Sequence, residues 1–121
     1  GPMADVTIYH NPRCSTSRAA LDAAAAAGVD VDVVQYLKNP LGNAELRGLI
    51  AKLEDAPTDL VRRDAAFARL GLTDEAVATA DQVVAVLTEH PELMQRPVLE
   101  RSDRAIIGRP KDRVPAFLRG A

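Results

Sequence analysis

The strongest constraint on the fold is a change of pattern near the start of the chain, where a strand signal is followed closely by a helix signal. Residues 6–9 (VTIY) are β-rich, and the Asn-Pro pair at 11–12 is typical of a turn. An alanine-rich helical pattern then runs from Ser15 to Gly28, a glycine suited to end a helix. Cys14, the only cysteine of the chain, therefore falls at the N-terminus of the predicted helix.

This position favours a reactive thiol. The unpaired N–H groups and the dipole at a helix N-terminus stabilise an anion, which can be a thiolate or a bound oxyanion. A lone cysteine is often only a small buried hydrophobe. The neighbours of this one, however, are polar or basic, which argues against a dry core position: Asn11, Arg13, Ser15, Thr16, Ser17 and Arg18. We therefore interpret Cys14 as a nucleophile.

The length and composition are those of one compact domain. With 121 residues, 47% of them hydrophobic, the chain is long enough to bury a core, and we expect a single domain over residues 4–121. The Gly-Pro pair at 1–2 precedes the first methionine, and we interpret it as a cloning remnant.

Charge and hydropathy exclude several kinds of partner. The net charge of −2 is spread over interspersed acidic and basic residues, so we expect no nucleic-acid partner. The longest apolar stretches are shorter than a membrane span, and no signal segment is recognised, so we expect a cytoplasmic protein without membrane contact. No apolar interface stripe is evident, which favours a monomer.

The single cysteine limits the redox chemistry. No disulfide can form within the chain, so an external thiol must resolve any oxidised state of Cys14. A metal site is not expected, because only His10 and His90 could add soft ligands.

The order of the remaining elements predicts the fold class. A β-branched run at 29–37 completes a βαβ unit with parallel strands. A helical region at about 43–90 follows, with Asn43 as the first N-cap, a short helix closing at Leu70-Gly71, and a helix at about 81–89. Runs at 97–100 and 105–107 form a hairpin, and a last helix near Pro110 contains Pro115, which is expected to shorten or kink it. This is an α/β, thioredoxin-like fold with a mixed four-stranded sheet and a helical insertion between its βαβ and ββα halves.

Arginines occur at three predicted element boundaries: in the Arg62-Arg63 pair, before Pro97 and before Pro110. Thioredoxin-like folds place a cis-proline opposite the active cysteine, so we predict a cis peptide bond between Arg96 and Pro97. This geometry would bring Arg96 beside Cys14. A guanidinium suits a tetrahedral oxyanion, because it donates two parallel hydrogen bonds and keeps its charge.

The stretch at 9–18, with Arg62, Arg96 and Arg109, resembles the glutaredoxin-dependent arsenate reductases of bacteria. The specific parts are His10, Asn11, Pro12 and Cys14 followed by Ser17 and Arg18, the His90-Pro91 and Arg96-Pro97 pairs, and Gly108-Arg109-Pro110. The resemblance implies that Cys14 attacks arsenate and that the arginines at 62, 96 and 109 hold the oxyanion.

The same resemblance extends the predicted site and names the reductants. It implies that His10 tunes the thiolate, and Asn11, Ser17 and Arg18 complete the predicted substrate site. The reductants would be glutathione, or another low-molecular-weight thiol, and glutaredoxin, with no bound cofactor. The choice between Arg62 and Arg63 stays open at this point.

Two alternatives remain and a third is excluded. The chain could be a thiol-dependent reductase of another substrate, or a non-enzymatic Spx-like regulator that binds RNA polymerase. Such regulators commonly use a Cys-x-x-Cys switch, whose second position is Ser17 here. A phosphatase-type arsenate reductase needs an arginine six positions after the cysteine, where this chain has Ala20.

Overall fold

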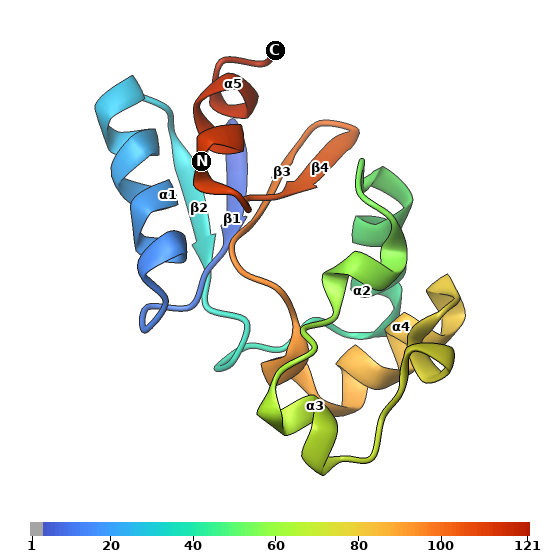
Figure 1. Ribbon diagram of the computed structural model, residues 1–121. Coiled ribbons are helices and arrows are strands. Elements are labelled where there is room, and N and C mark those ends of the chain that lie inside the picture. The colour runs from blue at the N-terminus through green and yellow to red at the C-terminus, as the bar shows by residue number, and fades with distance from the viewer. Residues whose placement is uncertain (1–3) are drawn as a thin grey trace.

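The computed structural model describes residues 4–121 and contains a four-stranded mixed sheet (Figure 1). The strands are β1 (Val6–Tyr9), β2 (Val31–Val34), β3 (Val98–Arg101) and β4 (Arg104–Ile107), in the order β2-β1-β3-β4. The β1–β2 pair is parallel, and the β1–β3 and β3–β4 pairs are antiparallel. The predicted thioredoxin-like fold is therefore confirmed. The predicted cloning remnant at 1–2 lies outside the described residues.

One face of the sheet is covered by α1 (Ser15–Ala27) and the short C-terminal helix α5 (Val114–Leu118) (Figure 1). The small side chains of Ala20 and Ala24 let α1 lie close to the buried Ile8 of β1. As predicted, α1 ends at Gly28, which adopts the left-handed conformation and donates its N–H to the last turn.

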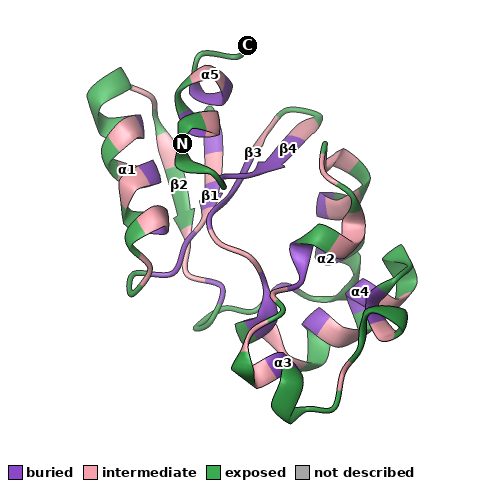
Figure 2. Ribbon diagram, in the orientation of Figure 1, coloured by how far each residue is buried: buried purple, intermediate pink, exposed green. Residues whose placement is uncertain are grey.

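The helices between β2 and β3 build a second core. They are α2 (Asn43–Lys52), α3 (Ala65–Arg69) and α4 (Ala80–Glu89), joined by 3-10 turns at Pro57–Leu60, Asp74–Val77 and Pro91–Leu93. Their apolar faces meet Val98, Ala105 and Ile107 of the β3–β4 hairpin. Buried positions consequently line the inner sides of both the hairpin and the helical region (Figure 2).

Two boundary predictions were wrong. The strand expected at 29–37 pairs only over Val31–Val34, because the chain turns at Gln35, whose carbonyl accepts two backbone N–H groups. The N-cap of α2 is Gly42 and not Asn43. Glu45 explains this shift, since its carboxylate accepts the Gly42 N–H at 3.1 Å and serves as the cap.

The C-terminal helix is broken into two pieces. A 3-10 turn at Lys111–Arg113 comes first, and α5 begins only at Val114. Pro115 therefore lies in the first turn of α5, where its missing N–H has no intrahelical partner to lose. The helix is short, as predicted, and the proline is accommodated at its start. Among residues 4–121, no helix is long and apolar enough to cross a membrane.

Replacing Gly108 with alanine is expected to destabilise the protein by about 1–3 kcal/mol, because the hairpin leaves no room for a Cβ. An added Cβ would lie 2.7 Å from Cγ of Pro97 and 2.9 Å from Cδ1 of Leu99. Urea unfolding measures the change. Gly48→Ala, in an open position on α2, is the control and should stabilise by about 0.5–1 kcal/mol. Equal effects of the two variants would contradict the packing argument.

Candidate active site

Cys14 is the N-cap residue of α1 and is half-buried. The turn before it is closed by its own N–H, which donates to the Asn11 carbonyl at 3.0 Å. Its carbonyl in turn accepts the N–H of Arg18 at 2.9 Å and opens the helix. The predicted placement of the thiol at the helix N-terminus is confirmed.

The pKa of the Cys14 thiol is lowered from 9.0 to about 7. Burial is the largest single influence and raises the pKa. It is outweighed by the backbone N–H groups of Ser17 and Thr16 and by the guanidinium groups of Arg96 and Arg109, all of which favour the thiolate. The thiolate is therefore much more populated near neutral pH than it is for a free cysteine.

Arg96 and Arg109 reach the thiol from the neighbouring ends of β3 and β4. Nη1 of Arg109 lies 3.7 Å from Sγ of Cys14 and donates to the Arg96 carbonyl at 3.0 Å. The N–H of Gly108 donates to the Pro97 carbonyl at 2.8 Å, which extends the hairpin pairing to this level. The Arg96–Pro97 bond is cis, as predicted, and the Arg109–Pro110 bond is cis as well.

Arg62 is brought to this region by pairing outside the main sheet. The N–H of Arg62 donates to the Leu93 carbonyl at 2.7 Å, and the N–H of Gln95 donates to the Leu60 carbonyl at 2.8 Å. These bonds hold residues 60–62 beside residues 93–95, so Arg62 and Arg96 lie at the same edge of the molecule. The Arg62 guanidinium pairs with Asp64 at 3.1 Å and is only half-buried.

Arg63 points elsewhere. Its guanidinium donates to the carbonyls of Thr58 and Val61 at 2.6 and 2.7 Å and to Asp74 at 3.2 Å. These bonds hold the Arg63 guanidinium against the helical insertion between β2 and β3. Of the two adjacent arginines, Arg62 is the one whose charge acts on Tyr36 together with Arg96 and Cys14, so the geometry favours it as the substrate residue.

His10 is linked to the thiol through Ser17. Its Nδ1 shares a 2.6 Å hydrogen bond with Oγ of the fully buried Ser17, which also accepts the Asn11 N–H at 3.1 Å. Burial and then the charge of Arg18 lower the pKa of His10, so the ring is neutral at pH 7. The Ser17 side chain thus faces His10, while its backbone N–H faces Cys14.

Two predicted substrate residues hold the loop together in this structure. Asn11 accepts the N–H of Arg13 through Oδ1 at 2.9 Å, and Nη1 of Arg18 donates to the Pro12 carbonyl at 2.8 Å. The positive charge that stabilises the thiolate comes from Arg96, as predicted, and from Arg109, because folding brings the hairpin end to the helix N-terminus.

Tyr36 is a site residue that the sequence did not reveal. It is fully buried, and its hydroxyl lies 3.4 Å from the Met94 carbonyl. Burial raises the pKa of its phenol, and the charges of Arg96 and Arg62 partly oppose the shift. The phenol therefore stays protonated as a hydrogen-bond donor near the arginines. It falls inside the strand predicted at 29–37, and that pattern gives no signal of the direction in which its side chain points.

This arrangement can hold an anion next to a nucleophile. Guanidinium groups and helix N–H donors surround the thiol, so they stabilise negative charge both on sulfur and on a bound oxyanion. Within residues 4–121 no cluster of three or more potential metal ligands forms. The thiolate and the positive groups around it can support nucleophilic attack by Cys14 on an anionic substrate.

The chain matches the model of a known protein family. The model of the ArsC family matches residues 9–117, which include Cys14 and the arginines around it. The chain belongs to the ArsC family. This ArsC protein is 36% identical over 118 residues to an arsenate reductase of Neisseria meningitidis, with 96% of this chain and 100% of that relative covered.

Further ArsC relatives agree with the fold. An Escherichia coli arsenate reductase is 33% identical over 120 residues, covering 98% of this chain and 84% of that relative. A solved arsenate reductase from Vibrio cholerae superposes with a TM-score of 0.78 at 30% identity, covering 93% of this chain and 97% of that one. The thioredoxin-like architecture is thus shared along nearly the whole chain.

The alkylation rate of Cys14 by iodoacetamide is expected to rise with pH around a midpoint of about 7, because only the thiolate reacts. Arg109→Ala removes a positive charge beside the sulfur, so the midpoint should move upward toward 9.0. Arg47→Ala is the control, since Arg47 pairs with Asp81 on the surface of the insertion. An unchanged midpoint in Arg109→Ala would contradict the proposed stabilisation.

Proposed function

We propose that this protein reduces arsenate to arsenite, with Cys14 as nucleophile and with glutathione and glutaredoxin as external reductants. The observation that carries the proposal is a thiol with a pKa of about 7 whose sulfur lies 3.7 Å from a guanidinium nitrogen of Arg109. The relatives named arsenate reductase support it.

Arsenate would bind where positive charge converges on the thiol. The guanidinium groups of Arg62, Arg96 and Arg109 would surround its oxygens, and the N–H groups at the start of α1 would add donors. Their fixed positive charges reduce the repulsion between the Cys14 thiolate and arsenate. They also stabilise the negative charge that develops on the oxyanion. The neutral His10 would orient Ser17, and through it the first turn of the helix.

The first step forms a sulfur–arsenic bond. The Cys14 thiolate attacks arsenic, and one arsenate oxygen leaves as hydroxide, which takes up a proton to become water. The product is a thioester-like Cys14–arsenate adduct in which arsenic is still pentavalent. No electron has yet been transferred, so reduction needs two further thiols.

Those thiols must come from outside, because Cys14 is the only cysteine. The sulfur of glutathione displaces a second oxygen from arsenic as water. The thiolate of glutaredoxin then attacks the glutathione sulfur, forming a mixed disulfide and leaving two electrons on arsenic, which becomes trivalent. Water finally displaces the Cys14 thiolate and releases arsenite. Both reductants belong to the reducing cytoplasm, where we place the protein.

The residue at position 17 argues against the regulator alternative. A Cys-x-x-Cys switch needs a second thiol at position 17, and Ser17 is fully buried there with its hydroxyl bonded to His10 and the Asn11 N–H. A thiol-dependent reductase of another substrate remains the alternative, and the assay below separates it from an arsenate reductase by its dependence on arsenate.

Cys14→Ser is expected to abolish arsenate-dependent NADPH consumption in an assay coupled through glutathione, glutaredoxin and glutathione reductase. A serine hydroxyl is not ionised near pH 7, so it cannot form the adduct. Circular dichroism should show an unchanged fold, since one half-exposed atom is replaced. Full activity in Cys14→Ser, or wild-type activity that does not depend on arsenate, would overturn the proposal.

Arg62→Ala is expected to lower kcat/KM for arsenate by about 100-fold, the usual effect of losing one donor to a developing oxyanion. Arg63→Ala serves as the matched control, because the Arg63 guanidinium is bonded to Thr58, Val61 and Asp74. At saturating glutathione, it should lower stability and leave kcat/KM for arsenate within about threefold of wild type. The reverse pattern would assign the substrate role to Arg63.

A further inference from the structure

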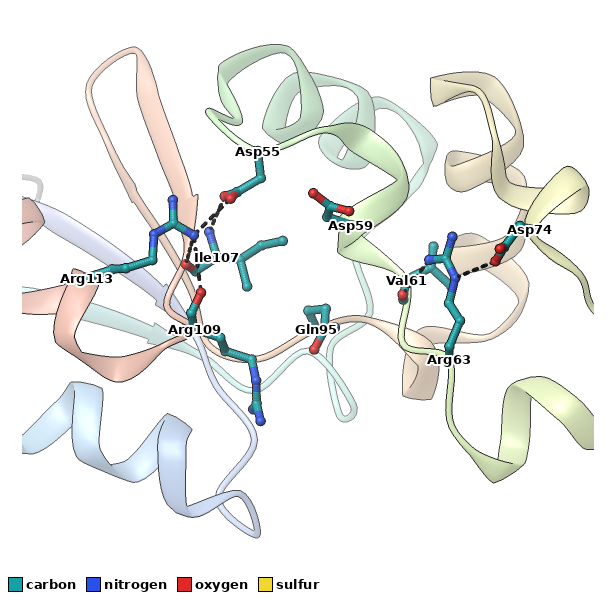
Figure 3. Close-up of a pocket in the computed structure, with 9 residues that line it drawn as sticks. All are labelled: Asp55, Asp59, Val61, Arg63, Asp74, Gln95, Ile107, Arg109 and Arg113. Carbon is teal, nitrogen blue, oxygen red and sulfur yellow. Dashed lines mark hydrogen bonds and ion pairs between the residues drawn. The ribbon is translucent and has the colours of Figure 1, made fainter.

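A polar groove of about 590 Å³ adjoins the thiol site (Figure 3). It lies between the hairpin end and the insertion, and its size is in the range of pockets that hold small molecules. Its lining has three acidic and three basic side chains together with an amide and two apolar residues: Asp55, Asp59, Asp74, Arg63, Arg109, Arg113, Gln95, Val61 and Ile107.

Most of the charges in the groove are already paired. Asp55 accepts hydrogen bonds from the Ile107 N–H and from Arg113, both at 2.9 Å. Asp74 pairs with Arg63 at 3.2 Å. These interactions fix two walls of the groove, one at the hairpin and one in the insertion.

Besides Arg109, two polar side chains of the groove are left to meet a ligand. Over residues 4–121, neither the Asp59 carboxylate nor the Gln95 side-chain amide forms a hydrogen bond or an ion pair with another residue. Asp59 extends from the 3-10 turn at Pro57–Leu60 toward the space between the walls, and Gln95 lies below it (Figure 3). The groove therefore offers a carboxylate and a neutral amide without side-chain partners, in addition to the Arg109 guanidinium at its end.

Arg109 connects the groove to the thiol. It lines one end of the groove, and its Nη1 contacts Sγ of Cys14 at 3.7 Å. A small molecule in the groove can thus present one end to the reacting sulfur while its other end stays beside Asp59.

We propose that this groove binds the low-molecular-weight thiol co-substrate, and that it selects a thiol carrying a protonated amino group, whose ammonium pairs with the Asp59 carboxylate. The thiol end then lies at Arg109, next to the arsenic held on Cys14. Gln95 bonds the amide groups between the two ends. The inference rests on the proposed function, and it adds to it the recognition of the attacking thiol.

The groove assists a balanced step. The thiol sulfur attacks the pentavalent arsenic of the adduct, its proton leaves with one arsenic-bound oxygen as water, and a new sulfur–arsenic bond remains. Arsenic is not reduced in this step. The two electrons arrive when the redoxin thiol attacks the co-substrate sulfur and forms the mixed disulfide.

The first test compares glutathione with N-acetylated glutathione, whose amine is neutral, at saturating arsenate and glutaredoxin. In wild type the KM for the acetylated thiol should be about tenfold higher, as expected for loss of a charged hydrogen bond. Asp59→Asn should raise the KM for glutathione by a similar factor and show no preference between the thiols. Asp59→Glu should restore part of the preference, and the KM for arsenate should not change.

Asp22→Asn on α1 is the matched control, since Asp22 is exposed and does not line the groove. It should behave as wild type with both thiols. A wild-type protein without preference for the free amine, or an Asp59→Asn variant that keeps it, would overturn the inference.

A second test needs no turnover. Unreactive S-methylglutathione, titrated into the ¹⁵N-labelled protein, should shift the backbone amide signals of Asp59, Val61 and Gln95, and do so more weakly in Asp59→Asn. Shifts confined to the separate cleft of His10, Pro12 and Leu37 would overturn the inference. Binding in the groove without arsenate turnover would remove the proposed function and leave the thiol site. Turnover that is indifferent to Asp59 would do the opposite.

Discussion

The site depends on the cost of holding a thiolate in a half-buried position. Burial alone would keep Cys14 protonated, and it is the largest single influence on its pKa. The compensation comes from two parts of the fold. The first turn of α1 supplies backbone N–H groups, and the hairpin end supplies the guanidinium groups of Arg96 and Arg109. Neither the helix nor the hairpin by itself contains all of these donors.

The arginines of the protein divide according to what already binds them. Arg63 and Arg113 are bonded to backbone carbonyls and carboxylates and shape the walls of the groove. Among residues 4–121, Arg109 is held only by the Arg96 carbonyl and the thiol, so its remaining N–H groups can meet an anion. The same residue type thus serves as support in one place and as a ligand-binding group a short distance away.

The two cores explain why a groove exists between the elements that carry these residues. One core lies between the sheet and the pair α1 and α5, and the other lies between the hairpin and the insertion. Each core is apolar, whereas the groove at the edge of the contact between hairpin and insertion is lined mostly by charged side chains. Arg109 joins the two places, because it lines the groove and also contacts Sγ of Cys14.

The sequence by itself determined the features that depend on neighbouring residues. The strand-turn-helix pattern predicted β1, the position of Cys14 and the end of α1 at Gly28, because helix propensity, turn pairs and caps act over a few residues. The tertiary structure decided what lies far apart in the chain. Segment pairing gave Arg62 and Arg63 different partners, and packing buried Tyr36 near Arg96. The contact between hairpin and insertion left Asp59 lining the groove. No local pattern encodes these positions, because each depends on contacts that form only when distant segments pack together.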